Sequence, residues 1–363
     1  MKTTFDHGGN VFSVARSLGI KPEDIADFSA SINPLGISTA VKEALISSFD
    51  RYTHYPDSDA VELSSGLAAF HGLDRNSVCV ANGSTELIYL MPRFLKGRRA
   101  LVIAPAFSEY ARALDRAGWD VAYLELDAEN GFSLSVPLLE EKLSGGFDAL
   151  FLCNPGNPTG KMLPLGTIKV VYRLCRASGT FLVLDEAFMD FCEAESAKHL
   201  LLDGGGVVLR SMTKFFAIPG LRLGYAMGSP EIIPELVSLR EPWSVNTPAQ
   251  IAGLAAIADT DYRLRTLQTI AEERALLAAQ LATLNGLTVY PSAANYLLVR
   301  LDEGPTAAEL RQRLLARGLL IRDCSNFQGL DTRFFRVAVR RRRENELLVR
   351  EMEKTLGDAG KLV

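Results

Sequence analysis

Short apolar runs recur along this chain, and each one ends at a polar or turn-forming residue. Five such runs occupy residues 100–104, 121–124, 149–152, 180–184 and 207–210, with amphipathic stretches between them. Short apolar runs bounded in this way are typical of strands buried on both faces, which occur in parallel sheets covered by helices. The sequence therefore predicts an α/β fold built around a largely parallel sheet.

Polar or turn-forming residues stand directly after four of these predicted strands. They are Pro105, Asn154, Asp185 and Ser211. Ligands in open α/β sheets bind outside the carboxyl ends of the strands. We therefore expect these four positions to converge on one site.

The pattern changes at residues 242–248, which read Pro-Trp-Ser-Val-Asn-Thr-Pro. A long helical stretch follows from about residue 249, rich in alanine, leucine and charge. Three further predicted strands, at residues 288–290, 295–299 and 334–339, accompany two helices. We interpret this part as a small α+β domain.

Composition excludes several classes of function. The 363 residues suffice for two domains, and the net charge of −4 gives no general attraction to nucleic acid. The basic run at residues 340–343 is interpreted as a solvated helix start. No apolar stretch approaches the roughly 20 residues of a membrane helix, and the N-terminus lacks the apolar core of a signal peptide. Five scattered cysteines without a CxxC pair predict reduced thiols and a cytoplasmic protein, and no metal site is expected.

Lys214 lies among small hydroxyl residues, with an arginine shortly after it. The segment reads Ser211-Met212-Thr213-Lys214 and continues to Arg222. A lysine amine can form a Schiff base with an aldehyde cofactor, while hydroxyls and a guanidinium can hold the phosphate of that cofactor. A lysine without these neighbours would be interpreted as a solvated surface residue. This setting predicts a covalent cofactor site.

Two upstream residues suit the same cofactor. The carboxylate of Asp185 can pair with a pyridine nitrogen and keep it protonated, which makes the ring an electron sink. Asn157, within residues 154–160, can donate a hydrogen bond to a phenolic oxygen. The alternative for Asp185 is a helix or turn cap. Together with Lys214, the two residues favour a pyridine aldehyde.

Gly83, Ser84 and Thr85 precede a helical stretch. A glycine allows close backbone approach, and the free N–H groups of a helix N-terminus suit a phosphate. The alternative is a plain N-cap, in which a hydroxyl bonds the backbone of its own helix. By themselves, these three residues favour the cap.

The order of these segments resembles the fold-type I, aminotransferase-like enzymes that use pyridoxal 5'-phosphate, over almost the whole chain. The resemblance implies a mostly parallel seven-stranded sheet in a large domain at residues 36–247. It also implies that residues 1–35 join residues 248–363 in the small α+β domain.

The same resemblance implies a role for each cofactor residue. Lys214 would bind the cofactor covalently and Asp185 would pair with its ring nitrogen. The cofactor phosphate would be held by Gly83, Ser84, Thr85, Ser211, Thr213 and Arg222.

Aromatic residues around the expected cofactor follow the family only in part. Tyr110 would stack on the cofactor ring, with Phe107 as the alternative. Many relatives carry a tyrosine three residues after the aspartate, whereas this chain has Phe188, which has no hydroxyl to donate. Asn157 would then be the main donor to the phenolic oxygen. Simple core packing is the alternative for Phe188.

Arg336 stands in an apolar predicted strand, where a guanidinium is costly unless it is paired. A substrate carboxylate and an internal aspartate are the two candidate partners, and the resemblance implies a carboxylate clamp. Asn157 would also contact the substrate.

Three segments of the chain are similar to the threonine-phosphate decarboxylase family. The histidinol-phosphate aminotransferases are the next most similar family. The similarity rests on residues 7–10, 27–36 and 213–222. It implies that Arg322 binds a substrate phosphate, with His7 and Asn33 as further donors. By composition alone, His7-Gly8-Gly9 is typical of a flexible tail.

Tyr55-Pro56-Asp57 matches a segment that reaches the cofactor phosphate of the neighbouring subunit in relatives. This match implies a homodimer with shared active sites. The alternative is a surface turn.

The reaction does not follow from the residues alone, because decarboxylation and transamination differ by a rotation about one bond of the bound substrate. The resemblance implies decarboxylation of L-threonine O-3-phosphate. The alternatives are a histidinol-phosphate aminotransferase and a non-catalytic protein that binds pyridoxal phosphate.

Overall fold

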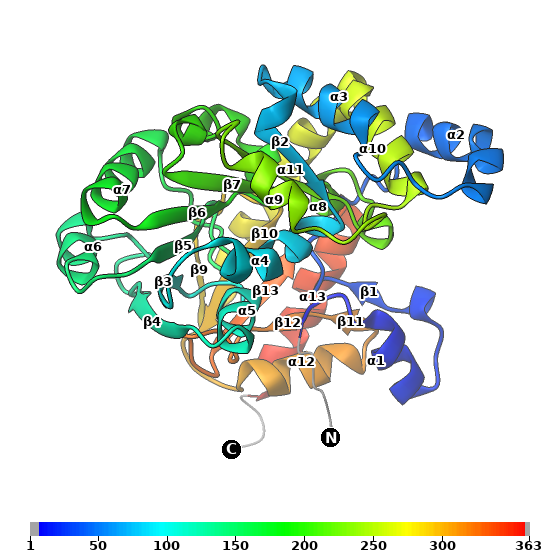
Figure 1. Cartoon of the computed structure of the whole chain (residues 1–363). Helices are drawn as coiled ribbons and strands as arrows, with labels where there is room; N and C mark the ends of the chain where they lie inside the picture. Colours follow the sequence, from blue (N-terminus) through cyan, green and yellow to red (C-terminus); the bar gives the residue numbers. More distant parts are fainter. Residues whose placement is uncertain (1–6, 360–363) are drawn as a thin grey trace.

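The structure, a computed structural model, describes residues 7–359 and contains one seven-stranded sheet (Figure 1). Its strand order is β2-β8-β7-β6-β5-β3-β4, and β8 alone runs antiparallel to its neighbours. The predicted seven-stranded, mostly parallel sheet is therefore confirmed. The strands are β2 (Val78–Ala81), β3 (Arg99–Ala104), β4 (Asp120–Glu125), β5 (Ala149–Cys153), β6 (Phe181–Asp185), β7 (Gly206–Ser211) and β8 (Gly224–Gly228).

Helices cover both faces of this sheet, because successive strand side chains point to opposite sides. On β5, Leu150 and Leu152 join one apolar cluster, whereas Ala149 and Phe151 join another. The first cluster includes α3 (Val61–His71), α6 (Val136–Leu143), α7 (Leu165–Ser178) and α10 (Thr247–Ala258). The second includes α4 (Gly83–Phe94), α5 (Glu109–Arg116) and α9 (Ile233–Ser238).

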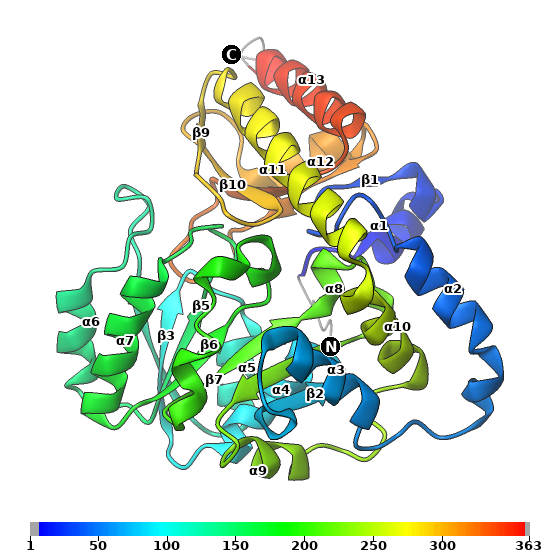
Figure 2. The ribbon, with the colours of Figure 1, turned by 90° about the horizontal axis from the view of Figure 1, so that it is seen from above.

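A second, antiparallel sheet lies in a smaller lobe, set apart from the large sheet in Figure 2. Its order is β12-β13-β10-β9, with β9 (Leu287–Val289), β10 (Tyr296–Leu301), β12 (Arg322–Asp323) and β13 (Phe334–Ala338). Its apolar core is shared with α11 (Thr260–Ala282), α12 (Ala307–Leu315) and α13 (Arg342–Ala359).

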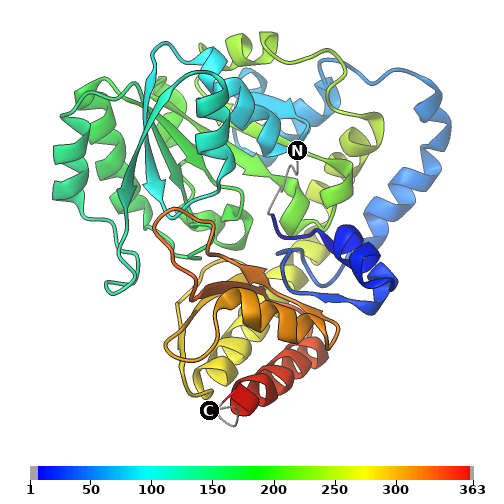
Figure 3. The same cartoon turned by 90° about the horizontal axis from the view of Figure 1, so that it is seen from below.

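The N-terminal segment packs on this small lobe (Figure 3). It contains α1 (Val11–Leu18) and β1 (Ala26–Asp27), and β1 pairs in parallel with β11 (Leu319–Leu320). The Gly9 N–H donates to Ser29 Oγ at 2.9 Å, and a Cβ on Gly8 would lie 2.1 Å from the Ser29 carbonyl oxygen. Residues 7–9 are thus held against the protein, contrary to the alternative of a flexible tail.

The domain boundary predicted after residue 247 falls at the start of α10, and this helix packs on the large lobe. Helix α10 packs in the same core as Leu63 and Leu223, and a Cβ on Gly253 would lie 2.7 Å from the Leu223 side chain. Tyr262, at the start of α11, belongs to that core as well. Small residues let α10 approach the large sheet closely, so the chain leaves the large lobe within α11.

The remaining elements connect these two lobes. Helix α2 (Thr39–Ser47) lies against α10 at the edge of the molecule (Figure 2), and α8 (Met212–Phe215) follows β7 directly. Over residues 7–359, none of the helices combines the length and the apolar character that a membrane crossing would need.

The basic run at residues 340–343 does more than start a solvated helix. Arg340 Nη1 donates to the Asp27 carbonyl at 3.1 Å, and Arg341 Nε donates to the Pro34 carbonyl at 2.9 Å. The run therefore fastens the N-terminal segment to the beginning of α13, a contact between residues far apart in the sequence.

A buried group of charges lies where β6 and β7 end. Arg210 has no exposed surface, donates to Glu186 Oε2 at 3.0 Å and to Glu193, and lies 3.3 Å from Asp190. Desolvation makes such groups costly, and breaking the pair leaves a buried charge without its partner. Arg210 should therefore contribute far more to stability than an exposed arginine does.

We predict that Arg210→Leu lowers the free energy of unfolding by about 3–5 kcal/mol. The matched control is Arg333→Leu, because Arg333 pairs with Asp331 at 2.9 Å and both side chains are half exposed. Loss of that surface pair should change the free energy of unfolding little, because solvent screens exposed ion pairs. Urea unfolding followed by circular dichroism measures both variants, and equal losses would contradict the prediction.

Candidate functional site

A cavity of about 590 Å³ opens where the carboxyl ends of β6 and β7 meet the small lobe and the N-terminal segment. Most of the residues predicted from the sequence line this one cavity, although they lie far apart in the chain. They are His7, Ser84, Thr85, Tyr110, Asn157, Asp185, Ser211, Thr213, Lys214, Arg222, Arg322 and Arg336.

Lys214 lies in α8, directly after β7. Its Nζ donates to Ser211 Oγ at 3.1 Å and lies 5.3 Å from the ring centre of Phe188. Burial lowers the pKa of Lys214, and the charge of Arg222 acts in the same direction, while the charge of Asp185 opposes them. The amine is therefore more readily neutral than an exposed lysine, and the neutral form is the one that attacks an aldehyde.

Asp185, at the end of β6, is held by two donors. The Tyr110 hydroxyl donates to Oδ2 at 2.5 Å, and the Ala187 N–H donates to Oδ1 at 2.9 Å. Burial raises the pKa of this carboxyl group, while the hydrogen bond from Tyr110 and the charge of Lys214 oppose the rise. A cationic ligand group would favour the ionised carboxylate, so a protonated pyridine nitrogen suits this position.

Tyr110 and Phe107 both line the cavity, with ring centres 5.9 Å apart in an edge-to-face arrangement. Tyr110 is buried and its hydroxyl is bonded to Asp185, whereas Phe107 is half-buried. The stacking role of Tyr110 stays a prediction. Its contact with Asp185 was not foreseen, because no linear spacing relates the two positions.

Gly83 has a backbone that only glycine tolerates easily, with φ at +74°. A Cβ at this position would lie 2.6 Å from Nη2 of Arg222. The missing side chain therefore makes room for the guanidinium beside the N-terminus of α4. Arg222 Nη1 also donates to the Pro219 carbonyl at 3.1 Å.

Four hydroxyl residues line the cavity together with Arg222. Ser84 and Thr85 begin α4, and the hydroxyls of Ser211 and Thr213 lie 2.8 Å apart. Within the described residues, neither the Ser84 nor the Thr85 hydroxyl bonds the backbone of its own helix. The N-cap alternative is therefore not observed, and the arrangement fits a phosphate group.

Arg336, on β13, joins the large lobe to the N-terminal segment. Its Nη1 donates to Asn157 Oδ1, and its Nη2 donates to the Ser29 carbonyl at 3.0 Å. Within residues 7–359, no carboxylate forms an ion pair with Arg336, so the alternative of an internal aspartate is not observed. The remaining N–H donors of the guanidinium are available to a ligand.

Two buried polar atoms of the cavity wall have no partner among the described residues. They are Nε of Arg336 and Oγ of Ser31. A buried polar group without a hydrogen bond costs about 1–3 kcal/mol, so such groups mark positions where a ligand completes the structure. Ser31 was not predicted as a site residue, because nothing in its local sequence distinguishes it from the serine at Ser29.

Phe188 lies in the cavity wall and packs edge-to-face on Tyr296, with ring centres 4.9 Å apart. The Tyr296 hydroxyl donates to the Gly156 carbonyl at 2.5 Å. Phe188 therefore packs against Tyr296 and also lines the cavity. It has no hydroxyl group to donate to a ligand.

Arg322 and His7 lie in the wall formed by the small lobe and the N-terminal segment. Arg322 Nη1 donates to the Asp323 carbonyl at 2.6 Å, and its Nη2 donates to Asn326 Oδ1 at 2.8 Å. His7 Nε2 lies 2.8 Å from Glu109 Oε1. The structure thus brings both predicted phosphate-binding residues to one side of the cavity.

Asn33, predicted as a further donor to the substrate phosphate, is hydrogen-bonded inside the protein. Its amide donates to the Phe215 carbonyl at 2.8 Å, to Tyr262 at 2.9 Å and to Thr266 at 2.8 Å, and its Oδ1 accepts from the Leu35 N–H. The side chain is buried and outside the cavity wall. The structure therefore does not bring Asn33 to the cavity, and its contact with a substrate phosphate stays a prediction.

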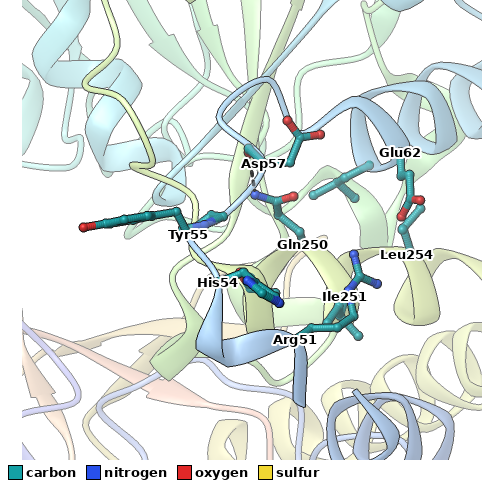
Figure 4. Close-up of a pocket in the computed structure, with 11 residues that line it drawn as sticks. Arg51, His54, Tyr55, Asp57, Glu62, Gln250, Ile251 and Leu254 are labelled. Atoms are coloured by element: carbon teal, nitrogen blue, oxygen red, sulfur yellow. Dashed lines mark hydrogen bonds between the residues drawn. The ribbon is translucent and has the colours of Figure 1, made fainter. Parts of the chain in front are cut away.

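Tyr55 also lies outside the cavity, and 81% of it is exposed. Its ring stacks on Trp243 at 4.7 Å beside a separate hollow of about 350 Å³. Figure 4 shows the Tyr55 ring projecting away from the other labelled side chains of that hollow. Any contact of Tyr55 with a cofactor therefore requires a second chain.

Comparison with known proteins reveals close relatives. The chain is 40% identical over 353 residues to a threonine-phosphate decarboxylase of Salmonella typhimurium, an alignment that covers 96% of each chain. The structure is similar to the histidinol-phosphate aminotransferase of Clostridium acetobutylicum, with a TM-score of 0.85 and 27% identity. It is also similar to the L-threonine-O-3-phosphate decarboxylase of Porphyromonas gingivalis, with a TM-score of 0.80 and 28% identity. Both structural matches cover 91% of this chain and 99% of the other.

The model of the aminotransferase class I and II family matches residues 23–351, which is most of the chain. This chain belongs to the aminotransferase class I and II family.

Proposed function

We propose that this chain decarboxylates L-threonine O-3-phosphate to (R)-1-aminopropan-2-yl phosphate and CO2, a step of cobalamin biosynthesis, with pyridoxal 5'-phosphate as its cofactor. One observation carries the proposal: a single cavity contains Lys214 together with two buried arginines, Arg322 and Arg336. A substrate with both a phosphate and a carboxylate needs such cations at separate points. The 40% identity to a threonine-phosphate decarboxylase supports the same substrate.

The cavity wall fits the cofactor. Lys214 would bond the aldehyde carbon, Asp185 would pair with the ring nitrogen, and Asn157 would donate to the phenolic oxygen. The phosphate would lie between Arg222 and the N-terminus of α4, where the absence of a side chain on Gly83 leaves room. When bound, pyridoxal phosphate supplies an electron sink for the bond that breaks at Cα of the substrate.

Three residues would orient the substrate. The free donors of Arg336 and the Ser31 hydroxyl would hold the α-carboxylate, and Arg322 would hold the side-chain phosphate. Together these contacts would fix the rotation about the bond to Cα, which decides whether the carboxylate or the proton departs. The orientation therefore depends on groups from both lobes.

Lys214 would also move the proton that the reaction requires. Cleavage of the bond between Cα and the carboxylate carbon releases CO2, and Cα must then gain one proton. The lowered pKa of Lys214 lets Nζ release a proton more readily than an exposed lysine does, which suits general acid–base catalysis.

We predict that the holoenzyme converts threonine phosphate to the amine and CO2 without any 2-oxo acid. Mass spectrometry of the products, with and without 2-oxoglutarate, checks this outcome. A 2-oxo product that forms only when 2-oxoglutarate is present would identify an aminotransferase instead. An inert protein with bound pyridoxal phosphate would favour the non-catalytic alternative.

We predict that borohydride attaches the pyridoxyl group to Lys214, because its buried, readily neutral amine is the nucleophile in the cavity. Peptide mapping after reduction checks the position of the label. Lys214→Ala should lose turnover and still retain the cofactor through the phosphate site and Asp185. A label at another lysine, such as the exposed Lys142, would disprove the assignment.

We propose further that the protein is a homodimer whose active sites are shared. The exposed Tyr55 ring stacks on Trp243, which is also half exposed, and Phe49 is a further large exposed apolar residue nearby in the chain. A partner chain would cover these rings and bring Tyr55 to the cofactor phosphate of the other subunit. This arrangement supports the role that the resemblance implies for residues 55–57.

Exchange of subunits between two variants tests this architecture. We predict that mixed Tyr55→Phe and Lys214→Ala dimers regain one intact site, with activity up to about half of wild type per heterodimer. If Tyr55 acted within its own chain, no intact site would form and activity would not recover. Tyr55→Phe alone should lose about 1–3 kcal/mol of binding, a loss large enough to measure.

A further inference from the structure

A second, smaller hollow of about 160 Å³ lies beside the main cavity, between α12 and the N-terminal segment. The two hollows share four residues, since His7, Gly8, Ser29 and Arg322 line both. The smaller hollow adds polar groups that the main cavity lacks: Asn10, Arg311, Gln312 and Asp323.

Helix α12 directs Arg311 toward this hollow. Leu310 and Leu314 are buried in the core of the small lobe, so the helix presents another side to the N-terminal segment. Ala308 and Arg311, one turn apart, both line the hollow. Arg313, two positions further on, is exposed and does not line it.

The opposite wall is held in place by the N-terminal segment. Parallel pairing places Asp27 beside Leu320, and Ser29 follows two residues later. The Gly9 N–H donates to Ser29 Oγ, and the absence of a side chain on Gly8 permits its close approach to the Ser29 carbonyl. The hollow therefore lies between two elements that are held in place, α12 and the N-terminal segment.

The charge of this wall is predominantly positive. Arg311 is half-buried and has no hydrogen bond or ion pair within residues 7–359, and Arg322 is only 6% exposed. The single carboxylate of the wall, Asp323, accepts the Ser325 N–H at 2.9 Å. A half-buried guanidinium without an ion pair, such as that of Arg311, favours an anionic ligand in the hollow.

We propose that this hollow binds a phosphate-type dianion through Arg311, with Gln312 and His7 as further donors. Guanidinium groups bind phosphate through paired hydrogen bonds. A water molecule occupies about 30 Å³, so the hollow offers room for a phosphate group and the first atoms attached to it. No role in the main cavity accounts for an arginine at this position.

The dianion has two possible sources. One is the phosphate of the substrate or product, an assignment that rests on the proposed function. In that case the phosphate of the substrate contacts Arg311 in addition to Arg322. The other is inorganic phosphate, which would bind beside Arg322 whatever the substrate is. The chemistry of the site is the same for both.

The experiment compares Arg311→Gln with Arg313→Gln in the holoenzyme. Titration calorimetry with inorganic phosphate should show about ten- to hundredfold weaker binding for Arg311→Gln, the factor expected from one charged hydrogen bond. Arg313→Gln, on the exposed side of the same helix, should bind phosphate as wild type does. Gln312→Glu, which adds a negative charge to the hollow, should weaken binding as well.

Kinetics with threonine phosphate and threonine separate the two sources. A higher KM for threonine phosphate alone in Arg311→Gln assigns the hollow to the substrate phosphate. An unchanged KM with weakened phosphate binding assigns it to inorganic phosphate. Melting temperatures check that Arg311→Gln and Gln312→Glu are folded. The proposal is overturned if both folded variants match Arg313→Gln in phosphate binding and in KM. The calorimetric titration stays informative even if threonine phosphate is not the substrate.

Discussion

The guanidinium of Arg336 joins the three parts of the chain that form the cavity. It is carried by the small lobe, donates to Asn157 of the large lobe and donates to the Ser29 carbonyl of the N-terminal segment. A buried guanidinium is costly, and these two hydrogen bonds offset only part of that cost. Arg336 also lines the cavity, and its Nε has no partner among the described residues, so the side chain that joins the three parts is also a candidate ligand contact.

The ends of β6 and β7 depend on a second set of buried charges. Asp185 and Ser211, the last residues of these strands, are each adjacent in sequence to a member of the Arg210–Glu186 pair. Side chains alternate across a strand, so the ionic pair faces away from the cavity while its neighbours face into it. This pair therefore supports the strand ends that carry Asp185 and Ser211.

Asn33 connects the N-terminal segment to two elements beside the cavity, α8 and α11. Its backbone N–H donates to the Lys214 carbonyl at 3.0 Å, and its amide bonds the Phe215 carbonyl and Thr266 of α11. The N-terminal segment is thereby tied to the helix that carries Lys214. Asn33 therefore stabilises the elements around the cavity without lining it.

The sequence by itself determined the layered sheet and the residues at its carboxyl edge, because strand periodicity and the position after each strand are local properties. It also determined that Lys214 and Asp185 belong to one site. Tertiary structure decided what depends on contacts between distant segments: the burial of Asn33, the bond between Tyr110 and Asp185, the unpaired Ser31 hydroxyl and the place of α10 in the large lobe. Linear spacing does not encode which polar atoms find partners across the fold, and hydrogen bonding inside the protein settles which side chains remain for a ligand.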